Sequence, residues 1–290
     1  TGFDADEIDI LFRDSVVAGV KEDEFDKPLP EKPISRQGDI WMLGKHKLIC
    51  GDSTKPETYS MLMEGQKASL IVTDPPYNVA YEGTAGTIKN DNMESKKFHE
   101  FLLSAFKCMY ENLADGGSIY VFHADRETVN FRTAFSEAGF FCHQTCIWVK
   151  NTPVLGRCAY QYNHEPILMG WKPTAGHQWY ADRKQRTTWN FDRPSKSKYH
   201  PTMKPVALVA YPIVNSSLSN SIVLDPFGGS GSTLIACEQT GRVCHTIELD
   251  EKYVDVIVER FRVFKGFDEG IYLLRDGEKI CYEKAREINK

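Results

Sequence analysis

The sequence predicts an α/β protein built on a sheet that helices cover on both faces, and three observations lead to that fold class. Short β-rich runs alternate along the chain with longer amphipathic stretches. Several of the runs are apolar at every position, as strands are when both faces of the sheet are covered. The chain has 290 residues, of which 41% are hydrophobic and 12% aromatic, so a sizeable core is expected and disorder is excluded.

The predicted strands are short runs rich in β-branched and other apolar residues. They lie at Lys47–Cys50, Ser69–Thr73, Ser118–Phe122, Phe140–Val149, Pro166–Trp171, Ser221–Leu224 and Val243–Glu248. The predicted helices repeat apolar residues with a helical period, at Lys96–Leu113, Glu127–Ala138, Pro205–Leu218, Ser232–Thr240 and Glu251–Phe264. Near the end of the chain, Asp276-Gly277 between two apolar runs predicts a β-hairpin.

Residues 1–36 are predicted to be an acidic linker or arm. They hold ten acidic and five basic residues, so their charge of −5 equals that of the whole chain, and the remainder is neutral overall. Pro28, Pro30 and Pro33 lie close together and leave room for at most one short helix, around Glu7–Phe12. We expect a solvated tail.

Composition also bounds the location of the protein. No apolar run reaches the roughly 18 to 20 residues that a membrane-spanning helix needs. The first residues have no basic start followed by an apolar core, so a cytoplasmic protein is expected.

The eight cysteines include no CxxC pair and are expected to be buried, reduced thiols. Cys142 and Cys146 should share one face of a strand with His143 on the other, which disfavours a metal site.

Positive charge is concentrated between Lys150 and Lys204, where ten bases and three acids give a net charge of +7. Tryptophan and tyrosine residues lie among the bases, as they do on surfaces that bind nucleic-acid phosphates and stack on bases. An ordinary basic surface loop has the same composition and stays open. The candidate DNA-binding residues are Arg157, Arg183, Lys184, Arg186 and Arg193.

A glycine-rich turn follows the predicted strand at Ser221–Leu224. Asp225-Pro226-Phe227-Gly228-Gly229-Ser230-Gly231 leads directly into a predicted helix, where glycines permit a tight turn and the helix N-terminus favours an anionic group. About 20 residues later the next strand ends in Glu248, the spacing at which nucleotide-binding sheets place an acid against ribose hydroxyls. The pattern predicts a nucleoside-bearing cofactor; the alternative is a structural turn.

A second unusual segment, Asp74-Pro75-Pro76-Tyr77, follows the strand at Ser69–Thr73. Two consecutive prolines have no N–H groups and fix the backbone, so the segment offers a carboxylate and carbonyl acceptors beside one aromatic ring. Such a site suits a planar group that carries an NH₂, with Tyr77 stacked on its ring. A proline-stiffened strand exit without a ligand is the alternative.

Together these two motifs resemble the amino-group DNA methyltransferases that use S-adenosylmethionine. The catalytic motif precedes the cofactor motif, as in the circularly permuted β class. Three further segments match: Cys50-Gly51-Asp52-Ser53, His200-Pro201-Thr202-Met203-Lys204-Pro205, and Ile247-Glu248-Leu249-Asp250-Glu251-Lys252-Tyr253. The resemblance covers roughly residues 38–264. It implies a Rossmann-like methyltransferase sheet with strand order 3-2-1-4-5-7-6 and an inserted DNA-recognition region.

The resemblance also implies the chemistry. Asp-Pro-Pro-Tyr is usual for methylation of adenine N6, and Ser-Pro-Pro-Tyr is commoner for cytosine N4. Asp74 and the Pro75 carbonyl would accept the hydrogens of the amine of a flipped base in double-stranded DNA, with Pro76 stiffening the motif and Tyr77 stacking on the base. No metal is implied.

Cofactor contacts follow from the same resemblance. The amino-acid moiety of S-adenosylmethionine would lie against the glycine-rich turn and its ribose against Glu248. Asp52 would lie near the adenine, and Thr202 and Lys204 near the methionine carboxylate. The residues implied at the turn are Asp225, Phe227, Gly228, Gly229 and Gly231.

The resemblance divides the chain into five parts. They are an arm at 1–36, a catalytic half at 37–150, a target-recognition insertion at 151–199, a cofactor half at 200–264 and a C-terminal hairpin extension at 265–290.

Ile40–Leu48 is similar to methyltransferases that follow ParB-like nuclease domains in phages and mobile elements, so an upstream fusion and a bacterial or phage source are expected. A homodimer stays open. Three rivals remain: a cytosine N4 enzyme, a catalytically silent DNA-binding subunit, and methylation of a protein glutamine or an RNA.

Overall fold

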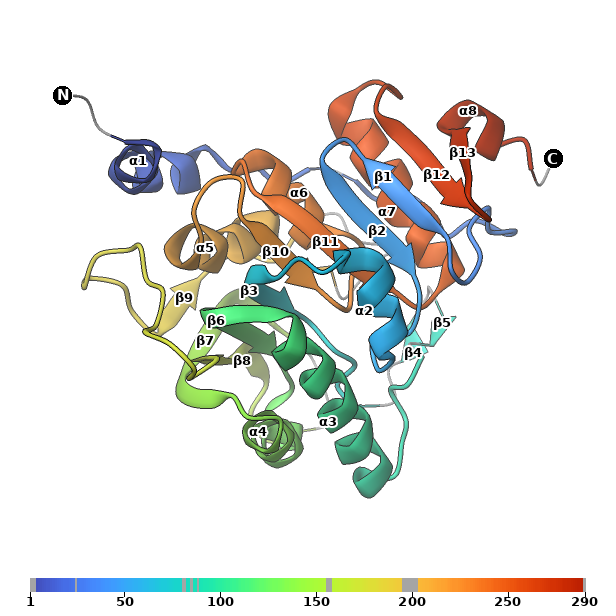
Figure 1. The fold of residues 1–290 in the computed structure, drawn as a ribbon. Coiled ribbons are helices and arrows are strands. Elements are labelled where there is room, and N and C mark those ends of the chain that lie inside the picture. The colour runs from blue at the N-terminus through green and yellow to red at the C-terminus, as the bar shows by residue number, and fades with distance from the viewer. Residues whose placement is uncertain are drawn as a thin grey trace.

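The computed structural model describes residues 4–23, 25–79, 82–83, 86–87, 89–154, 158–194 and 203–288. Within these residues one mixed sheet of eleven strands runs through the molecule, with helices on both faces (Figure 1). Its strands are β1 (Ile40–Leu43), β2 (His46–Cys50), β3 (Ala68–Thr73), β6 (Leu113–Phe122), β7 (Phe141–Val154), β8 (Tyr162–Trp171), β9 (Thr188–Asn190), β10 (Ile222–Asp225), β11 (Val243–Glu248), β12 (Ile271–Arg275) and β13 (Glu278–Cys281). A separate two-stranded ribbon pairs β4 (Glu82–Gly83) with β5 (Gly86–Thr87).

The helices alternate with these strands. They are α1 (Ala5–Gly19), α2 (Pro56–Met63), α3 (Ser95–Asn112), α4 (Thr128–Glu137), α5 (Val206–Ser216), α6 (Ser232–Gln239), α7 (Glu251–Lys265) and α8 (Tyr282–Ala285). Side chains alternate between the two faces along each strand, so that Leu70 and Val72 of β3 pack towards α5, α6 and α7. Ile71 between them packs on the opposite face, towards α2, α3 and α4. The core therefore has one apolar layer on each side of the sheet.

The sheet has the strand order β13-β12-β1-β2-β11-β10-β3-β6-β8-β7-β9. From β2 to β6 the neighbouring strands are parallel, whereas β8 is antiparallel to both β6 and β7. With β10 taken as strand 1, the seven strands from β2 to β7 have the order 3-2-1-4-5-7-6. The strand order implied by the resemblance is therefore confirmed, and so is the predicted α/β fold class.

All of the strands and helices predicted from sequence patterns are present. The strands β6, β7 and β8 are longer than predicted. The sequence analysis missed β1, β4, β5, β9, α2 and α8 because each is too short to show a clear period. The C-terminal hairpin is confirmed: Asp276 and Gly277 both have positive φ, at 52° and 82°, and join β12 to β13. In the interval predicted as an insertion, β8 and β9 belong to the main sheet.

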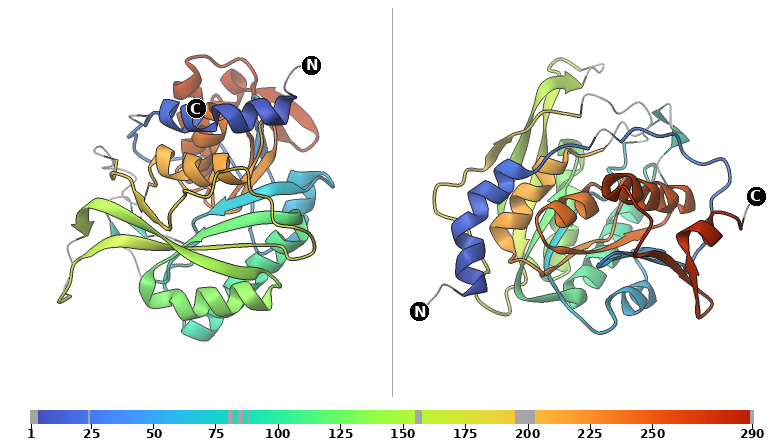
Figure 2. Two further views of the ribbon diagram at one scale, coloured as in Figure 1. Left: turned by 90° about the vertical axis from the view of Figure 1, so that its left-hand side faces the viewer. Right: turned by 90° about the horizontal axis from the view of Figure 1, so that it is seen from above.

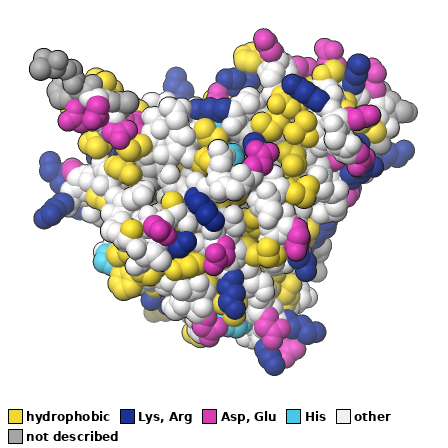
Figure 3. All heavy atoms as spheres, viewed as in Figure 1, with side chains coloured by type: hydrophobic (Ala, Val, Ile, Leu, Met, Phe, Trp, Pro, Cys, Tyr) yellow, Lys and Arg dark blue, Asp and Glu magenta, His cyan; other side chains and the backbone are white. Residues whose placement is uncertain are grey.

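The expectation of a solvated N-terminal tail is wrong. The helix α1 has fifteen residues and packs against α5, and its acidic side chains gather at the edge of the molecule (Figures 2 and 3). Asp9 pairs with the buried Arg242 at 3.1 Å, and Arg13 donates to Asn215 at 3.0 Å. Asp9 is thus the partner of an arginine from a distant part of the chain, which the composition of the segment alone does not show.

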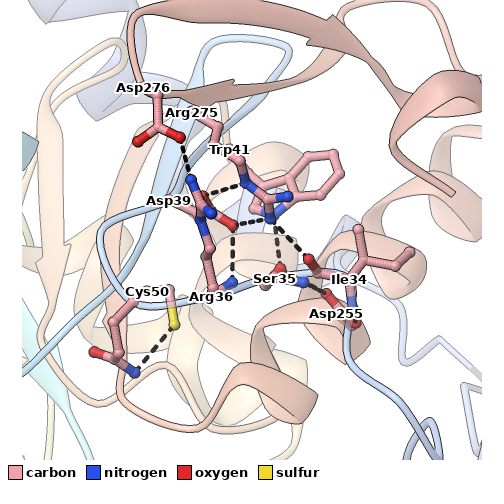
Figure 4. A network of polar contacts seen from close by, with 10 residues as sticks. Ile34, Ser35, Arg36, Asp39, Trp41, Cys50, Asp255, Arg275 and Asp276 are labelled. Carbon is pink, nitrogen blue, oxygen red and sulfur yellow. Dashed lines mark hydrogen bonds and ion pairs between the residues drawn. The ribbon is translucent and has the colours of Figure 1, made fainter. Parts of the chain in front are cut away.

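The end of the N-terminal segment is also fixed to the sheet. Asp39 accepts hydrogen bonds from Arg275 of β12 at 2.8 and 2.5 Å, and the amide of Ser35 donates to Asp255 of α7 at 3.1 Å (Figure 4). Trp41 donates to the Ser35 hydroxyl at 2.9 Å. This network joins the segment before β1 to the C-terminal hairpin and to α7.

The cysteine prediction needs one correction. Cys142 and Cys146 do not share a face, because β7 shifts its register against β8 between Cys142 and Gln144 and the alternation of side chains reverses there. Cys146 packs in the layer of α5, and Cys142 contacts the opposite layer. The thiols at positions 50, 108, 146, 237 and 244 are buried and free as expected, whereas Cys158 and Cys281 are exposed.

Candidate functional site

The two motifs meet at one edge of the sheet. Asp74 follows β3 and Asp225 ends β10, and these strands are parallel neighbours. Ligands of open α/β sheets bind outside the carboxyl ends of such strands. A cavity of about 500 Å³ lies there, within the range expected for a small-molecule site. Its lining includes the predicted residues Asp52, Asp74, Pro75, Pro76, Tyr77, Arg193, Lys204, Asp225, Phe227, Gly228, Gly229 and Glu248.

Six predicted site residues are not in that lining. Gly231 lies just behind it, at the start of α6, with φ of 86°. Arg183 and Arg186 line a second, smaller cavity of about 190 Å³, and Lys184 is exposed next to them. Arg157 and Thr202 lie outside the described residues.

Both carboxylate oxygens of Asp74 are engaged. Oδ1 lies 2.5 Å from the Tyr77 hydroxyl, and Oδ2 lies 2.6 Å from Nζ of Lys204. The ammonium of Lys204 also lies 5.2 Å from the centre of the Tyr77 ring. The resemblance implied that Lys204 lies near a methionine carboxylate, whereas in the structure its ammonium lies beside the Asp-Pro-Pro-Tyr motif.

A second carboxylate, which the sequence analysis missed, completes this cluster. Glu165 of β8 has Oε1 at 2.6 Å from Nζ of Lys150 of β7. Its Oε2 lies 3.0 Å from the Tyr77 hydroxyl and 3.3 Å from Nζ of Lys204. A signal was present, because Glu165 is one of three acids in the basic stretch and directly precedes an apolar strand. The cavity thus holds two lysines against two carboxylates on its Asp-Pro-Pro-Tyr side.

The two carboxyls of this cluster have pKa values displaced in opposite directions. Burial raises the pKa of Asp74, against the opposing effect of Lys204. Burial also acts to raise the pKa of Glu165, but Lys204 and Lys150 outweigh it and lower this pKa to about 2. The two lysines therefore keep Glu165 ionised. The protonation of Asp74 depends instead on the balance between its burial and the charge of Lys204.

The glycine-rich side of the cavity presents two further carboxylates. Asp225 accepts hydrogen bonds from the Thr73 hydroxyl at 2.8 Å and from the amide of Phe227 at 3.1 Å. Glu248 accepts from the amides of Gly229 and Asp250, both at 2.8 Å. Burial raises the pKa of each carboxyl to about 7. This wall of the cavity is rich in acceptors and suits a ligand that carries donors or positive charge.

Glycine is required at two positions of the turn. A Cβ on Gly228 would lie 2.7 Å from the Thr246 hydroxyl oxygen. Gly231 has positive φ, and a Cβ there would lie 3.2 Å from Ile257 of α7. Gly228 therefore permits close approach of the turn to β11, and Gly231 starts α6 against α7.

Hydrogen bonds from residues that the sequence analysis did not identify fix the loop after Tyr77. The buried Asp91 accepts from the amide of Tyr77 at 2.9 Å. Asn78, with φ of 56°, accepts from the amide of Met93 at 2.6 Å and donates to its carbonyl at 3.1 Å. These contacts hold the motif rigidly on the rim of the cavity.

A first prediction concerns Glu248 and pH in the absence of ligand. Folding raises the pKa of Glu248 from 4.5 to about 7, so over this interval the folded protein binds the proton more tightly and loses stability as pH rises. Glutamine has no charge at any pH. The free energy of unfolding of Glu248→Gln relative to wild type should rise by about 1 to 3 kcal/mol from pH 5 to pH 8, measured by denaturant titration. A difference independent of pH would contradict this.

The described residues form neither a metal-binding cluster nor a membrane-spanning helix. No three histidine, cysteine, aspartate or glutamate side chains within them come close enough to hold a metal ion. None of their helices is both long and apolar enough to cross a membrane.

Known proteins are similar to this chain in sequence and in fold. A family model described as DNA methylase matches residues 68–259. The type II methyltransferase M.HpaI of Haemophilus parainfluenzae is 28% identical over 246 residues, which cover 77% of this chain and 76% of that protein. The crystal structure of the M1.HpyAVI–SAM complex is similar with a TM-score of 0.56 and 25% identity, over 73% of this chain and 98% of the other. The cytosine-N4-specific PvuII DNA methyltransferase shares the fold, with a TM-score of 0.61 and 17% identity over 81% and 89% of the two chains.

Proposed function

We propose that this chain, which belongs to the DNA methylase family N6_N4_Mtase, transfers the methyl group of S-adenosylmethionine to the exocyclic N6 of an adenine flipped out of double-stranded DNA. The observation that carries the proposal is that one cavity joins the Asp-Pro-Pro-Tyr motif to the glycine-rich turn. A donor bound at the turn and a base held at Asp74 would therefore meet in the same space.

The residues on the glycine-rich side fit S-adenosylmethionine. This cofactor carries an ammonium group, a ribose diol and an adenine amine, all of which donate hydrogen bonds. Asp52, Asp225 and Glu248 supply acceptors along the wall, and Gly228 and Gly229 leave space next to them. When bound, the cofactor supplies a methyl group on a positively charged sulfur.

The residues at the other end act on the amine. An exocyclic amine is a poor nucleophile because its lone pair is delocalised into the ring. Acceptors that bind its hydrogens help to localise the lone pair as the methyl arrives in line. Asp74 and the Pro75 carbonyl fill this role in our proposal, and the Tyr77 ring stacks on the base.

Asp74 must first be freed from its present partners, and Glu165 makes this feasible. The Tyr77 hydroxyl lies 2.5 Å from Asp74 and 3.0 Å from Glu165. Nζ of Lys204 lies 2.6 Å from Asp74 and 3.3 Å from Glu165. Both donors can therefore turn to Glu165 while the target amine takes their place on Asp74, so no buried donor loses its partner.

Cytosine N4 is the second candidate target. The cytosine-N4-specific PvuII DNA methyltransferase shares this fold. We favour adenine because this chain has aspartate rather than serine at position 74, a choice that rests on the resemblance of the motif.

The class of substrate can be tested directly. S-adenosylmethionine with a labelled methyl group is incubated with the protein and, in separate reactions, with unmethylated double-stranded DNA, RNA or a mixture of proteins. We expect label in DNA alone. Label in RNA or in protein would show that this chain methylates that substrate instead of DNA. Binding to DNA without any transfer would indicate a catalytically silent subunit.

A second prediction concerns DNA binding by the basic segment. Arg183 and Arg186 line the smaller cavity beside α5, Lys184 is exposed next to them, and none of the three lines the main cavity. Replacing all three by glutamine should weaken DNA binding, and each lost phosphate contact should lower the log–log salt slope by about 0.9. Binding is measured by fluorescence anisotropy at several salt concentrations.

The control for this variant removes equal charge elsewhere. Lys96, Lys97 and Lys107 are exposed on α3, on the opposite face of the sheet. Their triple replacement by glutamine should leave the salt slope nearly unchanged. Equal effects of the two triple variants would show that the basic segment is only a solvated surface.

A further inference from the structure

Two consecutive residues of the segment that follows α1 contact α5 and α7, helices that each contribute a residue to the lining of the main cavity. The segment runs past α5 and α7 before it enters the sheet (Figure 2, right). Glu22 lies at the N-terminus of α5, and Asp23 lies against α7. Phe25 is buried, with 5% of its side chain exposed, which anchors this part of the segment.

Glu22 caps the helix that begins directly after Lys204. Its two carboxylate oxygens accept from the amides of Val206 and Ala207, both at 2.9 Å. The residue at the cap position, Pro205, has no side chain that could do this. A carboxylate at a helix N-terminus also stabilises the helix dipole. Glu22 therefore fixes the backbone from which the ammonium of Lys204 reaches Asp74.

Asp23 acts through a buried arginine. Arg260 of α7 has 1% of its side chain exposed and donates to the Asp23 carboxylate at 2.7 and 2.6 Å. The same guanidinium donates to the Ser230 carbonyl at 2.9 Å and to the Ser232 hydroxyl at 3.2 Å. Both serines line the main cavity and belong to the turn that begins α6.

These two contacts are joined into one network. The Ser232 hydroxyl donates to the carbonyl of Lys204 at 2.7 Å. Asp23, Arg260, Ser232 and Lys204 therefore form a continuous chain of hydrogen bonds from the N-terminal segment to the catalytic cluster. A buried guanidinium without its carboxylate partner is strongly unfavourable, so removal of Asp23 would force Arg260 and the turn that it holds to rearrange.

We propose that Glu22 and Asp23 are positioning residues for the cofactor, which hold the glycine-rich turn and the start of α5 in the geometry that binds S-adenosylmethionine. The N-terminal segment then stabilises the cofactor site and is more than a linker. The inference rests on the proposed function for the identity of the cofactor.

The chain contains a matched control within the same segment. Asp9 pairs with Arg242, whose side chain is 2% exposed, so this is also a buried aspartate–arginine pair that attaches the N-terminal segment. Its neighbours are Ser217 and Ser219, beyond the far end of α5, and none of these residues lines the main cavity. Loss of either pair should destabilise the fold, but only loss of Asp23 should affect the cofactor.

The experiment compares Asp23→Asn, Glu22→Gln and Asp9→Asn with wild type by calorimetric titration with S-adenosylmethionine and by thermal unfolding without it. For Asp23→Asn we expect the Kd to rise roughly 3- to 30-fold. KM for the cofactor should rise in parallel, by a larger factor than any fall in kcat at saturating cofactor. Asp9→Asn should lower Tm but keep the wild-type Kd. Glu22→Gln, which keeps one acceptor at the helix end, should give a smaller rise in Kd than Asp23→Asn.

The outcomes separate the two proposals. Absence of binding to wild type would contradict the assignment of the cofactor itself. Binding to wild type with an unchanged Kd in Asp23→Asn and Glu22→Gln would overturn the positioning role alone. An equal rise in Kd for Asp9→Asn would also overturn it, because the effect would then follow from general destabilisation. If Asp23→Asn does not fold, Glu22→Gln decides by the same measurement.

Discussion

Asp74→Ala is expected to transfer methyl groups about 10² to 10³ times more slowly than wild type, the loss typical of removing one preorganised polar contact to a reacting group. The target amine would lose its carboxylate acceptor, and the Pro75 carbonyl alone would remain. Single-turnover transfer to DNA at saturating cofactor measures this rate without a contribution from product release.

The fold and the cofactor should tolerate this change. Lys204 keeps Glu165 as a partner at 3.3 Å, so its buried ammonium is not left alone. Cofactor Kd, measured by calorimetry, should stay close to wild type because the glycine-rich side of the cavity is intact. Turnover near the wild-type rate in a folded Asp74→Ala protein would exclude the role assigned to Asp74.

Lys204→Met should make the reaction depend on pH in a new way. Burial raises the pKa of Asp74, and Lys204 is the main group that opposes this. Without the ammonium the pKa of Asp74 should rise further, because an opposite charge at this distance favours the ionised carboxylate. Only ionised Asp74 can accept the amine hydrogens in our scheme. The acid limb of kcat/KM should therefore lie at higher pH than in wild type.

Lys150→Met is the matched control. Nζ of Lys150 lies 2.6 Å from Glu165, and its salt bridge in the structure is to that carboxylate rather than to Asp74. This variant loses the same charge from the same cavity, yet its acid limb should lie close to that of wild type. A limb that stays in place in Lys204→Met, or that moves equally in both variants, would show that Lys204 does not control the charge of Asp74.

The sequence predicted the position of the cavity because its two defining motifs each follow an apolar strand. Asp74 and Asp225 both come at a strand end, and parallel strands bring their carboxyl ends to one edge. The resemblance added the information that β3 and β10 are neighbours in the sheet, which spacing alone cannot give. Most of the predicted cavity residues follow from these two facts.

The sequence could not predict the partners of these residues. Glu165 and Lys150 join the cluster around Asp74 because β8 and β7 lie beyond β6 in the sheet, and that adjacency is a property of the tertiary structure. The acids of the N-terminal segment read as solvated for the same reason. Asp23 looks like part of a charged linker until Arg260 of α7 is placed against it.

Composition also gave no geometry for the basic stretch. Arg193 lines the main cavity, whereas Arg183 and Arg186 line the smaller one, although ten residues at most separate them in sequence. The strand β9 lies between them and pairs with β7, so the chain passes from one cavity to the other along the sheet. A net charge over a segment does not show which of its side chains face a common site.

Methylation of adenine at N6 is tested by identifying the methylated nucleoside. Unmethylated DNA is incubated with the protein and labelled S-adenosylmethionine, digested to nucleosides and analysed by mass spectrometry, with Asp74→Ala in parallel. We expect N6-methyldeoxyadenosine with wild type and a greatly reduced amount with the variant. N4-methyldeoxycytidine as the labelled product, or no labelled nucleoside from wild-type protein that binds the cofactor, would contradict the account.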